Sequence, residues 1–131
     1  MEEEKMPRKV DSRIIRTKAA LRKSLYELIL DKGYDDISIQ NITDHADLGR
    51  ATFYLHYKDK DDLLQNLMQT ISDEFFQTLP EEEQQDNPFL NESALKRMFD
   101  YAEKYYDFYR ITISEKGGVV GIRYLMQIMR E

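Results

Sequence analysis

The sequence contains no cysteine, which excludes disulfide scaffolds, thiolate zinc sites, iron–sulfur clusters and cysteine nucleophiles. No apolar run approaches the roughly 18 residues of a membrane span, and the N-terminal MEEEK is not a secretory signal. Five glycines and three prolines in 131 residues are too few for a collagen-like or low-complexity chain. We therefore expect one globular domain, or two small units sharing a core, located in the cytoplasm.

Residues suited to enzymatic chemistry are also missing. No nucleophile–base pair, metal cluster or glycine-rich phosphate loop is found, and Gly117-Gly118 does not have P-loop spacing. His45 and His56 lack the spacing of metal ligands, so we expect both on the surface or packed against the protein. The sequence predicts a protein that is not an enzyme and has no metal or cofactor.

The net charge of −6 is an average over unlike segments. Residues 5–60 carry 12 basic and 8 acidic side chains, net +4, whereas residues 61–131 carry 7 basic and 14 acidic, net −7. A basic front half joined to an acidic back half favours a nucleic-acid-binding head on a body that does not bind nucleic acid. The alternative is that the charges simply scatter along the chain.

Apolar residues at helical spacing predict a first helix over residues 13–32, after a flexible arm at residues 1–12. Asp11 or Ser12 is the expected N-cap, and Gly33 the C-cap. A long later helix should be capped by Asp59, and each of the two helices should bury a stripe of four apolar residues. The two stripes are Ile14, Leu21, Leu25 and Leu28 in the first helix, and Leu63, Leu67, Ile71 and Phe75 in the later one.

Between them, two short helices are separated by Asp47-Leu48-Gly49. Ser38 is a favourable N-cap for the helix at residues 38–45, and Phe53 and Tyr57 face inward on the helix at residues 50–57. Two short helices joined by such a turn form a helix-turn-helix, whose second helix enters the DNA major groove.

The outward face of that second helix carries the candidate DNA contacts. Arg50 can recognise a guanine edge through two hydrogen bonds, Thr52 can contact a base or a phosphate, and Leu55 can pack on a thymine methyl. Ala51 also points outward. Phosphate contacts are expected from Tyr54, Lys58, Lys60 and the helix N-terminus at Ser38. The structural alternative is that Arg50 is a solvated charge and Tyr54 packs on the head.

The segment from Ile14 to Met68, above all GYDDISIQNITDHADLGRATFYLHYKDKDDLL, resembles the DNA-binding head of the TetR family of bacterial transcriptional regulators. Two positions depart from the commonest pattern. Asp47 stands where glycine is usual in the turn, and Gly49 where serine usually caps the recognition helix.

The resemblance implies a helix-turn-helix domain at residues 13–73, with the motif itself at about 37–56. It also implies a homodimer on a near-palindromic operator, most often acting as a repressor released by a small-molecule effector. Gln40 enters only through the resemblance, as a candidate for recognising adenine. The DNA contacts that it implies are Ser38, Gln40, Arg50, Ala51, Thr52, Tyr54, Leu55, His56 and Lys60.

The second half, residues 74–131, begins with a predicted loop at 79–91 and a helix from about Leu95 to Tyr109. Local pattern leaves residues 109–124 open between a β-hairpin and two helices. The resemblance implies helices, and so an all-α fold in which a long fourth helix joins the head to a C-terminal helical bundle. This bundle would serve regulation and dimerisation.

Two features of this half remain open. DFYRITISEKGG and GIRYLMQIM are similar to a C-terminal type found in some TetR-like regulators, including activators of dihydroxyacetone kinase operons. Family members normally continue for several more helices. The apolar pattern of residues 119–129 is still running near Glu131, so either the last helix stops there or the chain is cut short.

A set of aromatic residues could line an effector pocket. The alternatives are plain helix-bundle core, with Phe108 the least explained by it, and a binding surface for a protein partner. The candidates are Phe75, Phe76, Phe99, Tyr105, Tyr106, Phe108 and Tyr109.

Overall fold

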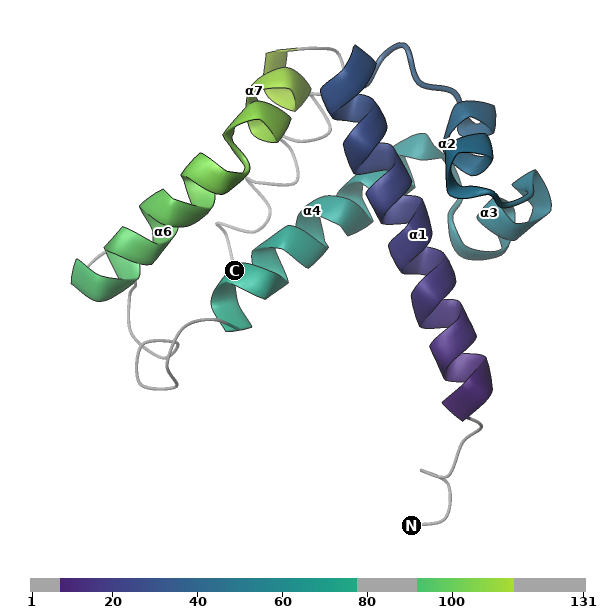
Figure 1. The fold of residues 1–131 in the computed structure, drawn as a ribbon, viewed down its shortest axis with the longest axis horizontal. Helices are drawn as coiled ribbons and strands as arrows, with labels where there is room; N and C mark the ends of the chain where they lie inside the picture. The colour runs from purple at the N-terminus through teal and green to yellow at the C-terminus, as the bar shows by residue number, and fades with distance from the viewer. Residues whose placement is uncertain (1–7, 78–91, 115–131) are drawn as a thin grey trace.

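The computed structural model describes residues 8–77 and 92–114, and all six regular elements in these segments are helices (Figure 1). The predicted all-α fold class is confirmed. The helices are α1 (Arg8–Lys32), α2 (Ile39–Ala46), α3 (Arg50–His56), α4 (Lys60–Gln77), α6 (Glu92–Lys104) and α7 (Tyr106–Ser114). None of these helices is long and apolar enough to cross a membrane.

Helix α1 begins earlier than predicted, at Arg8 instead of residue 13. The segment RKVDS contains no glycine or proline to stop the helix, so a cap at Asp11 or Ser12 is not used. The N-terminal turns extend past the other helices (Figure 1). Ile14, predicted in the core, is therefore 40% exposed.

One face of α1 forms the centre of the hydrophobic core. Leu21, Leu25 and Ile29 are fully buried, and α1 contacts α2, α4 and α7. Fully buried residues from the other helices complete this core: Ile42, Phe53, Leu63, Leu64, Met68 and Phe108. The predicted stripes on α1 and α4 are confirmed, except for Ile14 and the half-buried Phe75.

The connection between α1 and α2 is fixed to the start of α4. Gly33 adopts a left-handed φ of 83°, and its N–H donates to Ile29 O at 2.9 Å. The buried Tyr34 then donates its hydroxyl to Asp61 Oδ1. Burial raises the pKa of Tyr34 above its ordinary value, and the hydrogen bond and charge of Asp61 raise it further.

The second half differs from the prediction at Tyr105, where one continuous helix was expected. Helix α6 ends at Lys104 and α7 starts at Tyr106, and the two helices follow one another in space (Figure 1). The fully buried Phe108 of α7 packs on Tyr26 of α1, with ring centroids 5.3 Å apart. The hairpin alternative is wrong for residues 109–114, which are helical. Residues 79–91 and 115–131 lie outside the described segments.

We predict that the free energy of unfolding falls as pH rises past about 10. The folded state holds Tyr34 as a neutral phenol with a raised pKa, so the unfolded chain ionises first. Burial also raises the pKa values of Tyr26 and Tyr57, with the same sign. Tyr34→Phe should make this decline shallower, as measured by urea unfolding between about pH 8 and pH 11. An unchanged pH dependence in the variant would contradict the assignment to Tyr34.

Candidate nucleic-acid interface

The N-terminus of α2 is closed by a reciprocal capping box. Ser38 Oγ accepts from Asn41 N, and Asn41 Oδ1 accepts from Ser38 N, both at 3.0 Å. Ser38 is therefore the N-cap that the sequence predicted. Its contact with a DNA phosphate stays a prediction.

The turn between α2 and α3 depends on a left-handed residue. Asp47 has φ 59° and ψ 46°, a conformation that aspartate tolerates better than most side chains. The N–H of Asp47 donates to Asp44 O at 3.1 Å and that of Leu48 to Thr43 O at 2.8 Å. Leu48 packs against the core. The predicted tight turn is thus present, with Asp47 where glycine is usual in the family pattern.

Helix α3 is anchored by its inward face. Phe53 is fully buried and Tyr57 nearly so. The Tyr57 hydroxyl donates to Asn66 Oδ1 at 2.6 Å, and Arg22 donates to the same oxygen at 3.1 Å. Burial raises the pKa of Tyr57, although the nearby Arg22 opposes this effect. These contacts fix the orientation of α3 against α1 and α4.

The opposite face of α3 is open to solvent. Leu55 is 77% exposed and Tyr54 49%, and Arg50 and Ala51 are also exposed. A leucine this exposed on a short, firmly anchored helix has no role in the core. The face thus presents an arginine, a tyrosine and a leucine to solvent, and its contact with a major groove stays a prediction.

A groove of about 620 Å³ runs between this helix and the first turns of α1. The half-buried Thr52 and His56 line it from α3. From α1 it is lined by Arg13, Ile14 and Thr17, none of which the sequence analysis included in the site. The apolar spacing of Ile14 predicted a position in the core. In the structure Ile14 lies beyond the end of the helical layer and lines the groove instead.

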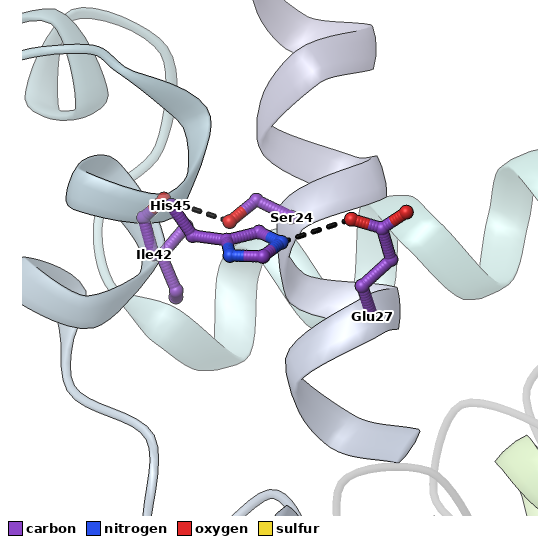
Figure 2. Close-up of polar contacts among 4 residues, drawn as sticks. All are labelled: Ser24, Glu27, Ile42 and His45. Carbon is purple, nitrogen blue, oxygen red and sulfur yellow. Dashed lines mark hydrogen bonds and ion pairs between the residues drawn. The ribbon is translucent and has the colours of Figure 1, made fainter. Parts of the chain in front are cut away.

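Figure 2 shows two of the polar contacts that fix helix α2 to α1. Ser24 Oγ donates to Ile42 O at 2.7 Å, and His45 Nε2 lies 2.9 Å from Glu27 Oε1. His45 is thus on the surface, as expected, and it is paired with the carboxylate of Glu27. Within residues 8–77 and 92–114, no cluster of acidic and histidine side chains could hold a metal ion.

Gln40 is exposed on α2, and its Nε2 donates to Asp44 Oδ1 at 2.8 Å. That contact uses one amide hydrogen and leaves the second, with the carbonyl oxygen, able to face an adenine. Lys58 is exposed between α3 and α4, as a phosphate contact requires. Its backbone N–H donates to Asp62 Oδ2 at 2.8 Å.

Lys60 lies in a different environment from the one expected of a phosphate contact. It is half-buried, and its ammonium donates to Tyr34 O and Ile37 O, both at 2.9 Å. The sequence predicted a surface charge at Lys60. It could not show the two carbonyls beside the ammonium, because they come from a segment more than twenty residues earlier.

The aromatic pocket candidates lie in three different environments. Phe108 belongs to the buried core, and Tyr105 and Tyr109 pack against that core. Phe75 stacks edge-on with both Phe76 and Tyr101. Phe99 and Tyr106 are instead 68% and 60% exposed, and they line an open depression of about 700 Å³. The expectation that Phe108 is the residue least explained by core packing is wrong.

Comparison with known proteins agrees with this geometry. Residues 21–67, which include all of α2 and α3, match the family described as bacterial regulatory proteins, tetR family. Over 68 residues the chain is 38% identical to the uncharacterized HTH-type transcriptional regulator YxbF of Bacillus subtilis (strain 168). The match covers 51% of this chain and 18% of that relative. No solved structure shows significant similarity.

Gly49→Ser is expected to stabilise the protein. Gly49 is the N-cap of α3, has φ −91° and ψ 160°, and makes no side-chain cap. A Cβ at this position would meet no atom within 4 Å. The lower entropy of the unfolded chain and the new capping hydroxyl should together add about 0.5–1 kcal/mol in urea unfolding. Gly49→Ala is the control. If it stabilises as much as serine, the hydroxyl contributes nothing.

Proposed function

We propose that the chain is a sequence-specific transcriptional regulator, because residues 21–67 match the tetR family of bacterial regulatory proteins. Helix α3 enters the major groove, and α2 crosses the DNA backbone beside it. The observation that carries this proposal is the contrast between the two faces of α3. Phe53 is fully buried, whereas Leu55 is 77% exposed on the same helix.

The proposed base and phosphate contacts follow from side-chain chemistry. Arg50, at the start of α3, recognises a guanine through its two forked donors, and Leu55 contacts a thymine methyl. Gln40 on α2 recognises an adenine. Tyr54, Lys58 and the α2 N-terminus contact phosphates and set the register of the complex.

The proposal extends to a homodimer that represses transcription and responds to a small-molecule effector. Two heads about one helical turn apart (~34 Å) would bind a near-palindromic operator. An effector that favours a state with wrongly spaced heads would release the DNA. Repression, pairing and effector response all follow from the family resemblance.

One observation favours a protein partner in place of a small molecule. Phe99 and Tyr106 are exposed beside three carboxylates, Asp100, Glu103 and Asp107, in the open depression on α6 and α7. Exposed aromatic residues are typical anchors of protein interfaces. A small-molecule effector would raise the melting temperature of the chain, whereas a partner would co-purify with it.

Arg50→Ala should weaken specific binding by about 1–3 kcal/mol and relax the preference at one base pair. Lys58→Ala should weaken binding to all sequences alike, because a phosphate contact carries no sequence information. Both side chains are exposed, so the fold should be unchanged. Operators are first selected from random DNA, and binding is then followed by fluorescence anisotropy at fixed salt. If both variants lose affinity equally on specific and random duplexes, Arg50 does not recognise a base.

The selected operators should be near-palindromes with half-sites about one helical turn apart. Light scattering of the complex should give a mass equal to one duplex and two chains. One chain on a non-palindromic duplex would contradict the proposed dimer while leaving DNA binding intact.

A further inference from the structure

The first residue of α4, Lys60, holds the connection between α1 and α2. Its ammonium donates to Tyr34 O and Ile37 O, each at 2.9 Å, and lies 4.1 Å from the centroid of the Tyr34 ring. Hydrogen bonds from a charged donor are roughly twice as strong as neutral ones. Lys60 therefore satisfies two carbonyls of a segment that is neither helix nor strand.

The next residue, Asp61, binds the same segment through the side chain of Tyr34. Asp61 accepts the hydroxyl of the buried Tyr34. Within the segment, the N–H of Ile37 donates to Tyr34 O at 3.2 Å. Lys60 and Asp61 thus bind the backbone and the side chain of one turn, which we call the α1–α2 clamp (Tyr34, Ile37, Lys60 and Asp61).

The clamped turn leads directly into the DNA-facing end of α2. Ile37 precedes the N-cap Ser38, whose capping box with Asn41 sets the first turn of the helix. Gln40 stands in that turn. A shift of the two carbonyls would therefore shift the capping box and Gln40 together.

We propose that Lys60 is a positioning residue for DNA binding, which orients the N-terminus of α2 through the carbonyls of Tyr34 and Ile37 and does not act as a phosphate contact. This inference rests on the proposed function. It also connects α2 to α4 at the point where α4 begins, so a movement of α4 would change the placement of Ser38 and Gln40.

Lys60→Met tests the clamp in the free protein, because methionine keeps most of the side-chain length and removes the ammonium. Amide hydrogen exchange should become about tenfold faster or more at Ile37 and Asn41. Exchange at buried amides of α1 and α4 should stay within about twofold of the wild type. Unchanged exchange at Ile37 and Asn41 would overturn the clamp.

The second arm measures binding to a labelled duplex long enough for two half-sites, over a series of salt concentrations. Lys60→Met should lower affinity about tenfold while the slope of log K against log [salt] stays at the wild-type value. Lys58→Met is the matched control, two residues away, and should lower the slope by about 0.9. A similar slope change in Lys60→Met would show a phosphate contact and overturn the proposal.

Two further variants separate positioning from loss of stability. Ile71→Val, in the core part of α4, should lower stability while keeping wild-type affinity. If it loses affinity as Lys60→Met does, the effect of Lys60 is merely structural. Tyr34→Phe loosens the clamp without changing the charge of the protein. If Lys60→Met fails to fold, Tyr34→Phe should give the same changes in exchange and affinity, only smaller. A wild-type chain that does not bind the duplex would refute the proposed function, while the exchange data would still decide whether the clamp exists.

Discussion

The buried face of α1 is the constraint on which the other helices depend. Leu21, Leu25 and Ile29 exclude water along about two turns of that helix, and α2, α4 and α7 all pack against it. Burial of large aliphatic side chains contributes roughly 1.5–3 kcal/mol each. The orientation of α2 and α3 is therefore set by a helix that itself contributes only its first turns to the proposed DNA interface.

The buried serine and threonine hydroxyls fit into this core because each donates to a helix carbonyl. Ser24 donates to Ile42 O across two helices, whereas Thr112 donates to Phe108 O within one. The fully buried Thr43 donates back to carbonyls of its own helix. Of these three hydroxyls, only that of Ser24 joins different elements, and it fixes α2 in the same region as the exposed His45–Glu27 pair.

Much of the head could be predicted from the sequence because its signals are local. Ser38, the Asp47 turn and the inward Phe53 follow from capping, backbone preference and helical spacing. The misassigned residues depend on distant contacts. Ile14 fits the apolar stripe but lies beyond the layer that would cover it, and Phe108 lies off the stripe but reaches α1 after the break at Tyr105. Lys60 has the chemistry of a phosphate contact, and only the fold brings two carbonyls to its ammonium.

The place of Phe108 has a consequence for dissecting the protein. Phe108 belongs to the same buried cluster as Leu21 and Phe53, and it packs on the ring of Tyr26 of α1. A shared cluster of this kind unfolds as one cooperative unit. A fragment ending at Gln77 would expose apolar surface on α1 that α7 otherwise covers. The head defined by its sequence motif is therefore smaller than the unit that folds, and limited proteolysis should not release it as a stable piece.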